Sequence, residues 1–410
     1  MSEARREPGD LRMRTAAIAL AITLAIQAFT ALAATAASVL APEIGRDLGI
    51  APKLIGIFVG LIYAGSMTGS LVSGGFIERY GAIRVSQVCV LLCVCGVSLV
   101  AGATTLPGLL VPTLVAAPII IGLGYGPITP ASSQVLARTA PPSRMALTFS
   151  IKQTGVPAGA ALAGALLPAA ALALGWRSAF SLVAMSGICI AIVAQTARAT
   201  LDTEHRPGRT LDISAIFAPL KRVLATPALR ELAVTAFVYA ALQVCLMSFL
   251  VVYLTETLSY SLVAAGLALT AANVGGIAGR IVWGAVADEY VAPRVLLGLI
   301  GIAAGSCAWS TATFGAGWPM EGILAVCVLF GGTAIGWNGV QLSELARNAP
   351  PGQAGAITGA AGFITFAGVV VGPSAFALIS ALTGGYRSGF VLFGGLCIAC
   401  GLWLLVKHRQ

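Results

Sequence analysis

The stretch "GGFIERYGAIR" (residues 74–84) places one Glu and two Arg between two long apolar runs. A related stretch, "GAVADEYVAPR" (residues 284–294), follows 210 residues later and again separates two apolar runs. At nearly the same offset, "LARTAPP" from Leu136 returns as "LARNAPP" from Leu345. Polar segments that recur at one offset predict a chain made of two structurally related halves.

The composition places the chain among membrane proteins. Hydrophobic residues make up 58% of its 410 residues and charged residues only 10%, whereas soluble domains have about 25% charged residues. Apolar runs long enough to cross a bilayer, about 20 residues each, recur throughout the chain, and the alternating segments typical of membrane β-barrels are missing. We predict twelve spans, at residues 16–40, 54–76, 84–104, 107–135, 145–172, 178–199, 230–255, 262–286, 294–315, 319–344, 354–382 and 387–406.

These observations predict an all-α polytopic membrane protein whose twelve transmembrane helices form two six-helix bundles related by a pseudo-twofold axis. We assign residues 1–199 to the first bundle with a short tail, 200–229 to a linker, and 230–410 to the second bundle.

The distribution of positive charge predicts the orientation. Of the 24 Lys and Arg residues, 18 fall on the side of the linker and termini, four on the opposite side and two inside spans. Because Lys and Arg are enriched in cytoplasmic loops, we expect the linker and both termini in the cytoplasm. The preference for Arg over Lys favours a bacterial inner membrane.

Several classes of function are not expected. The net charge of +9 has a topological explanation, so we expect no nucleic-acid partner. The nine cysteines lie in apolar runs without His or acidic residues at metal-ligand spacing, which predicts packing and not a metal site. We find no catalytic dyad or nucleotide-binding loop, and therefore expect a monomeric protein that is not an enzyme and needs no cofactor.

Two positive charges inside the spans are the strongest functional signal. Lys152 and Arg280 lie in spans five and eight, each about 10 Å from a span end at 1.5 Å per residue, whereas every Asp and Glu falls in a tail, a loop or a span end. A buried charge without a partner costs several kcal/mol. An anionic substrate is therefore the expected partner, although both side chains are also long enough to snorkel toward the cytoplasmic interface.

The repeated loop resembles a family signature. Gly74, Glu78, Arg79, Gly81 and Arg84 match the pattern G-x-x-x-[DE]-[RK]-x-G-x-[RK]-[RK] of the major facilitator superfamily, and the second copy is degraded. The fourth-span signature R-x-x-x-G-x-G is incomplete, because proline stands at position 118 in place of its arginine. The chain therefore resembles this superfamily over all twelve spans but lacks the arginine linked to proton coupling in some members.

The resemblance implies a substrate site between the halves. In the superfamily, spans five and eight face each other across a central cavity, and Arg280 resembles an arginine of carboxylate-transporting members. We expect Lys152 and Arg280 to bind one anion together. The polar and aromatic residues expected to join them are Gln27, Tyr125, Gln153, Asn273, Trp337, Asn338 and Gln341.

The resemblance also implies two cytoplasmic latches that hold an outward-open state. Glu78 is expected to meet the start of span eleven with Arg138, and Asp288 the start of span five with Arg347. The whole predicted set is Gly74, Glu78, Arg79, Gly81, Arg84, Arg138, Gly284, Asp288, Arg294 and Arg347. The alternative is that these are solvated loop charges that only fix the topology.

We therefore expect a secondary active transporter of a small organic anion, with carboxylates as the expected class, that works by alternating access. A proton or a counter-anion would be the coupled species. Two alternatives remain open at this point: an exporter of apolar drugs or metabolites, and a transporter-like solute sensor.

Overall fold

The computed structural model describes residues 8–50, 55–104, 108–203, 216–315 and 317–406. Among these residues every regular element is a helix, and twelve helices are long and apolar enough to cross a membrane. The predicted fold class and the number of spans are thus confirmed. The first residues of the tail and residues 204–215 of the predicted linker lie outside the described residues.

The first half of the chain contains six spans, three of them divided or followed by short elements. Its helices are α1 (Pro8–Val39), α2 (Ala41–Leu48), α3 (Ile55–Tyr80), α4 (Ala82–Ala101), α5 (Leu110–Tyr125), α6 (Ile128–Thr139), the 3-10 turn η2 (Pro142–Arg144), α7 (Met145–Gln153), α8 (Gly155–Leu174) and α9 (Trp176–Leu201). Spans four and five are therefore helix pairs, α5 with α6 and α7 with α8.

The second half repeats this order after a short helix. Its elements are α10 (Ala218–Ala225), α11 (Pro227–Val252), the π-helical turn η4 (Tyr253–Thr257), α12 (Leu262–Glu289), α13 (Pro293–Ala312), α14 (Met320–Ala334), α15 (Asn338–Asn348), α16 (Ala354–Thr383) and α17 (Arg387–Val406). Span ten is again a pair, α14 with α15. The breaks in spans four and ten fall in corresponding places of the two halves.

Small residues let the helices within each bundle approach closely. A Cβ added at Gly159 of α8 would lie 2.0 Å from the carbonyl oxygen of Ala28 in α1. A Cβ at Gly368 of α16 would lie 2.2 Å from the carbonyl oxygen of Phe237 in α11. Both positions belong to Gly-x3-Gly pairs, Gly155 with Gly159 and Gly368 with Gly372, a spacing that suits helix contacts in a bilayer, where van der Waals packing drives association.

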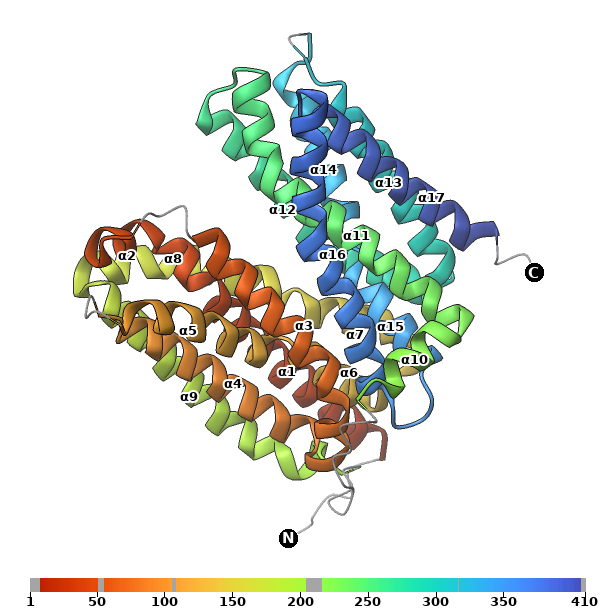
Figure 1. Ribbon diagram of the computed structural model, residues 1–410. Coiled ribbons are helices and arrows are strands. Elements are labelled where there is room, and N and C mark those ends of the chain that lie inside the picture. The colour runs from red at the N-terminus through yellow and green to blue at the C-terminus, as the bar shows by residue number, and fades with distance from the viewer. Residues whose placement is uncertain (1–7, 51–54, 105–107, 204–215, 316, 407–410) are drawn as a thin grey trace.

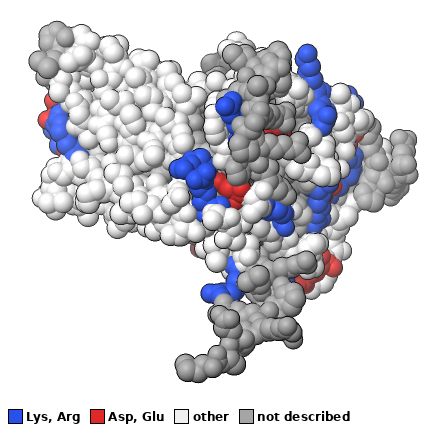
Figure 2. Space-filling view, turned by 90° about the horizontal axis from the view of Figure 1, so that it is seen from below, with Lys and Arg blue, Asp and Glu red and all other residues white. Residues whose placement is uncertain are grey.

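The two bundles touch at one end and diverge at the other (Figure 1). At the end near α10, which we call the closed end, α3 packs on α16 and α7 packs on α12 and α15. At the opposite, open end, α2 and α8 of the first bundle lie far from α12 and α14 of the second (Figure 1). Figure 2 views the molecule from the side of the closed end and shows Lys and Arg side chains next to Asp and Glu near its centre.

Candidate functional site

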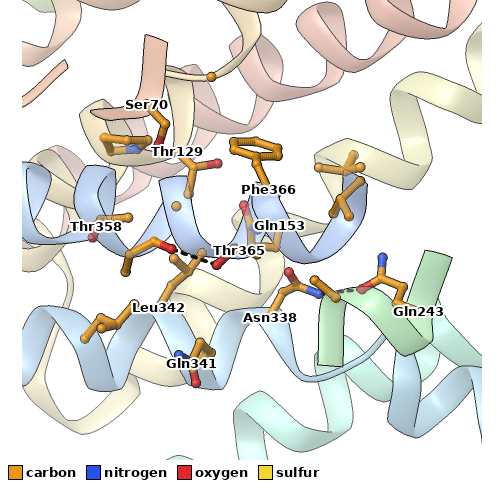
Figure 3. A pocket seen from close by; sticks show the side chains of 18 of the residues that line it. Ser70, Thr129, Gln153, Gln243, Asn338, Gln341, Leu342, Thr358, Thr365 and Phe366 are labelled. Atoms are coloured by element: carbon orange, nitrogen blue, oxygen red, sulfur yellow. Dashed lines mark hydrogen bonds between the residues drawn. The ribbon is translucent and has the colours of Figure 1, made fainter. Parts of the chain in front are cut away.

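A cavity lies between the two bundles and is lined by residues of both. Its volume is about 950 Å³, including space open to solvent. Figure 3 shows Ser70 and Thr129 on one side of this pocket and Asn338 and Gln341 on the other. The polar and aromatic residues that line it are Tyr63, Ser70, Tyr125, Thr129, Gln153, Gln243, Arg280, Trp337, Asn338, Gln341, Thr358, Thr365 and Phe366.

Arg280 of α12 belongs to the cavity wall and is almost fully buried, with 2% of its surface exposed. Its Nε donates to the carbonyl oxygen of Ile335 at 3.2 Å, and its Nη1 donates to the carbonyl oxygen of Gln153. Ile335 lies at the break of span ten and Gln153 at the break of span five. Arg280 is therefore held by backbone carbonyls from both halves of the chain.

Lys152 of α7 is also buried, with 1% exposed. Its Nζ donates to Gln27 Oε1 at 2.6 Å, to Gln153 Oε1 at 3.0 Å and to Thr129 Oγ1 at 3.4 Å. The ammonium group is thus directed at α1 and α6 inside the first bundle. It reaches the cavity only through Gln153 and Thr129, which line it.

Gln153 joins the two cations. Its side-chain oxygen accepts from Lys152 and its backbone oxygen accepts from Arg280. Within the described part of the chain, neither cation has a carboxylate partner, and no Asp or Glu lines the cavity. The site therefore has two positive side chains, from opposite halves, whose described acceptors are neutral oxygens.

Amide side chains of the second half complete the wall. Asn338 Nδ2 donates to Gln243 Oε1 at 3.2 Å, as the dashed line in Figure 3 shows. Gln341 Nε2 donates to the carbonyl oxygen of Leu232 at 2.6 Å, and its Oε1 has no hydrogen-bond partner among the described residues. Tyr125 lines the cavity from α5. These groups offer both donors and acceptors to a polar ligand.

Three of the predicted residues lie elsewhere or are engaged otherwise: Gln27, which accepts from Lys152 but does not line the cavity, Asn273 and Trp337. Asn273 is not part of the cavity wall, because its Nδ2 donates to the carbonyl oxygen of Leu269 one turn earlier in α12. Trp337 lines the cavity, but its Nε1 donates to Ala334 at 3.1 Å and its ring packs edge-on against Tyr239. Trp337 thus contributes an apolar surface and no donor.

Sequence reasoning missed the contribution of α3 and α16. Figure 3 shows Thr358, Thr365 and Phe366 on one helix, α16, and Tyr63 and Ser70 come from α3. Thr358 and Thr365 are seven residues apart, which is two helical turns on one face. That spacing indicates a polar face on the helix. A single Thr in a span, however, is indistinguishable from a residue that only packs between helices.

The second copy of the repeated loop connects the halves at the closed end. Asp288 Oδ1 and Oδ2 accept from the backbone N–H groups of Ala146 and Leu147, at 2.9 and 2.8 Å. Arg347 Nη2 donates to Asp288 Oδ1 at 3.2 Å. The carboxylate therefore caps the start of α7, where unpaired N–H groups and the helix dipole favour negative charge.

The first copy is built differently. At the start of α16, Gln134 Oε1 accepts from Gly355 N–H at 2.8 Å and Gln134 Nε2 donates to Gly352 at 3.0 Å. The described hydrogen bonds of Arg138 reach Leu201 O, at 2.6 Å, and Thr203 at the end of α9. An uncharged amide thus caps the start of α16 in this half.

Asp202, at the end of α9, fixes the first loop to the first bundle. It accepts from Ile83 N–H at 2.8 Å and from Arg84 N–H at 3.0 Å, at the start of α4. Gly81 precedes them with φ +92°, and a Cβ there would lie 2.4 Å from Asp202 Cγ. The signature glycine is required by both its backbone conformation and this close contact.

Of the other predicted loop residues, the arginines contact their own bundle and the glycines contact the opposite one. Arg294 donates to Glu231 and to the carbonyl oxygen of Leu404, and the Arg79 guanidinium lies 5.2 Å from the centre of the Tyr80 ring. A Cβ at Gly74 would meet Ala356 at 2.8 Å, and one at Gly284 would meet Ser150 at 2.6 Å. The two glycines thus let α3 approach α16 and α12 approach α7.

Comparison with known proteins identifies the family. The sequence profile of the Major Facilitator Superfamily matches residues 23–373. The chain belongs to this superfamily. Its members are membrane transporters of small solutes, not enzymes, which confirms the expectation of a multi-pass membrane protein with a transport activity.

Individual relatives are distant. The chain is 24% identical over 403 residues to the hexuronate transporter of Bacillus subtilis (strain 168), covering 90% of this chain and 89% of that one. The E. coli fucose:proton symporter FucP superposes with a TM-score of 0.74 at 15% identity, covering 97% and 100% of the two chains. The human organic anion transporter MFSD10 (TETRAN) gives 0.73 at 16% identity, also covering 97% and 100%.

Proposed function

We propose that this superfamily member is a secondary active transporter of a small organic anion with a carboxylate group. The observation that carries this proposal is the meeting of Lys152 and Arg280 at Gln153, beside a cavity with no acidic residue among its described lining. Two cations without a carboxylate partner give the site a positive potential, which an anionic substrate would neutralise.

Arg280 is the group expected to touch the substrate. A guanidinium has five N–H donors in a planar fork that matches a carboxylate, and in the described residues Nη2 of Arg280 has no hydrogen bond. Lys152 has three donors, and its three described acceptors match them. Lys152 would therefore contribute charge from behind Gln153 and Thr129.

Within the carboxylates, a sugar acid is the first substrate to test. A relative at 24% identity is a hexuronate transporter, and the cavity wall carries several amides and hydroxyls, including Gln243, Asn338 and Thr365. Such groups pair with the hydroxyls of a sugar, whereas a purely apolar carboxylate would leave them without partners.

The positive charges at the closed end support an orientation with the linker and both termini in the cytoplasm of a bacterium. In that orientation the open end faces outward. Asp288 with Arg347, and Gln134 at the start of α16, would then be the latches of the outward-open state, with Glu78 and Arg138 in the surrounding loop. A proton or a counter-anion would be the coupled species.

The test is uptake of radiolabelled solutes into proteoliposomes that contain the purified protein. The panel holds D-glucuronate, D-galacturonate, lactate, uncharged D-glucose and the cation tetraphenylphosphonium. We expect uptake of at least one carboxylate, and a loss of more than tenfold in Arg280→Ala and of several-fold in Lys152→Ala.

A variant outside the cavity serves as the control. Arg46→Ala removes a cation of α2 whose described ion pair, with Glu43, is exposed on both sides, and should leave uptake within about twofold of wild type, as surface ion pairs contribute little. Transport of tetraphenylphosphonium that is unaffected by both cavity substitutions would overturn the proposal in favour of an apolar-drug exporter.

A further inference from the structure

The carbonyl group that holds Arg280 is an unusual acceptor inside a helix. In a continuous helix the carbonyl oxygen of residue 153 would accept from the N–H of residue 157. Residue 157 is proline, which has no N–H. Pro157 therefore leaves the Gln153 oxygen without its helical donor, and the helix of span five is interrupted at Thr154, between α7 and α8.

Arg280 fills this vacant position from the opposite half. Its Nη1 donates to the Gln153 oxygen, and both residues are buried, with 2% and 6% exposed. The carbonyl has no helical donor and gains a charged one, which makes the hydrogen bond about twice as strong as a neutral one. The bond crosses between the bundles, since Gln153 belongs to α7 and Arg280 to α12.

We propose that Pro157 is a positioning residue: it creates an acceptor that tethers Arg280 across the halves in the empty transporter, and an anionic substrate replaces that acceptor when it binds. Only the replacement of this acceptor by a bound anion rests on the proposed function. The tether is a property of the ligand-free protein, whatever solute is carried.

The exchange of one acceptor for another has two consequences. Without substrate, the tether adds to the contacts that keep α7 against α12 and α15. With substrate, the guanidinium gives up a neutral carbonyl for a carboxylate, so that the protein is not left with an unpaired buried charge at any stage. This replacement of the acceptor also breaks a direct hydrogen bond between the two halves. Binding of the substrate is thereby linked to separation of the halves.

The substitution Pro157→Val tests this directly. Valine has about the volume of proline and restores an N–H, which would compete with Arg280 for the Gln153 oxygen. The matched control is Pro168→Val in the same helix α8, where Pro168 is exposed and a Cβ added at Gly164, four residues earlier, would meet nothing within 4 Å. Both changes add a helical N–H, but only the first affects a carbonyl that binds Arg280.

The first measurement uses no ligand. Hydrogen–deuterium exchange of the full-length protein in detergent follows the amides of α15 (Asn338–Asn348), which packs against α7 but carries neither substitution. We expect roughly three- to tenfold faster exchange there in Pro157→Val and wild-type rates in Pro168→Val. In an Arg280→Gln background, Pro157→Val should have no further effect, because the donor of the tether is already gone.

The second measurement is the Kd of labelled D-glucuronate, or of whichever carboxylate of the uptake panel is transported. We expect roughly three- to tenfold tighter binding in Pro157→Val, because the anion no longer competes with the Gln153 carbonyl. Equal exchange in the two proline variants, or an effect of Pro157→Val that persists in Arg280→Gln, would overturn the tether. If no anion binds, the proposed function fails while the exchange measurement still decides the tether.

Discussion

At the scale of single residues, the central question is how the protein tolerates two buried cations. Neither is neutralised by a described acid, and each is instead surrounded by neutral oxygens: three side-chain oxygens for Lys152 and two backbone oxygens for Arg280. Hydrogen bonds offset part of the desolvation penalty but leave the charge itself. This arrangement stabilises the empty site and preserves its attraction for an anion.

The substitution Gln27→Met tests whether the Gln27 side-chain oxygen stabilises the buried charge of Lys152. The substitution keeps the volume but removes the oxygen 2.6 Å from Nζ, and a lost hydrogen bond to a charged group costs about 1.5–3 kcal/mol. We expect a lower thermal midpoint in detergent, measured by the fluorescence of a thiol-reactive or intrinsic probe. The double variant Gln27→Met/Lys152→Met should recover much of the loss, because no unpaired charge remains.

A control for this experiment lies in α9. Gln195→Met also removes an amide oxygen, but one that accepts from the neutral Gln87 at 3.1 Å on an exposed side chain. It should change the midpoint little. Equal effects of the two glutamine variants, or a double variant less stable than Gln27→Met, would show that Gln27 does not stabilise the Lys152 charge.

At the scale of the elements, hydropathy predicted the twelve spans but not their interruptions. Spans four, five and ten are each two helices, with breaks near Pro127, Thr154 and Gly336. The apolar character continues through each break, so a hydropathy profile shows one span. In spans four and five, the prolines at positions 127 and 157 indicate a break. The break in span ten has no proline beside it and depends on packing that cannot be deduced from the sequence.

The same limit applies to the site. Lys152 and Arg280 were predictable because a charge inside an apolar run is conspicuous, and Asp288 because its loop is repeated. The sequence analysis wrongly predicted that Asn273 lines the cavity. The sequence alone does not distinguish an amide side chain that faces a ligand from one that bonds to its own helix. The hydroxyls of α16 were missed because the face that a helix turns to the cavity depends on its neighbours.

Asp288 offers a test at the scale of an element, because it caps the start of α7. Asp288→Ala removes acceptors for two N–H groups and the partner of Arg347. Loss of a helix cap costs about 1 kcal/mol, so α7 amides should exchange about fivefold faster, as measured by hydrogen–deuterium exchange. Transport should also change if the closed state is stabilised by this contact.

The matched control is an acid in an exposed pair. Glu43→Ala removes the partner of Arg46 in α2, at the open end, and surface pairs contribute about 0–1 kcal/mol. Its exchange in α7 and its uptake rate should equal those of wild type. Unchanged α7 exchange and uptake in Asp288→Ala would support the alternative that the loop charges only fix topology.

At the scale of the whole molecule, the halves are similar in fold but unequal in how they meet. The second copy of the loop caps α7 with a carboxylate and an arginine, whereas the first half caps α16 with the amide of Gln134. Both contacts must break if the closed end opens, so alternating access predicts that a covalent link there stops transport.

A cysteine pair at positions 134 and 355 can supply that link. A Cβ at Gly355 would lie 3.2 Å from Gln134 Cβ, a few tenths of an ångström below the usual disulfide range of about 3.5–4.5 Å. The background replaces Cys95 and Cys189, the exposed cysteines among the described residues, by serine. After oxidation, we expect Gln134→Cys/Gly355→Cys to bind the carboxylate through the open end but to lose more than nine-tenths of its uptake in proteoliposomes, and dithiothreitol to restore it.

The single variant Gly355→Cys, treated with the same oxidant, separates the effect of the link from that of the substitution and should transport in both conditions. Mass spectrometry of the intact protein verifies the disulfide before uptake is measured. Because the comparison is between oxidised and reduced forms of one protein, loss of the Gln134 cap affects both equally. Undiminished uptake by the fully oxidised pair would mean that the halves need not separate at the closed end, and alternating access about the cavity of Arg280 would be wrong.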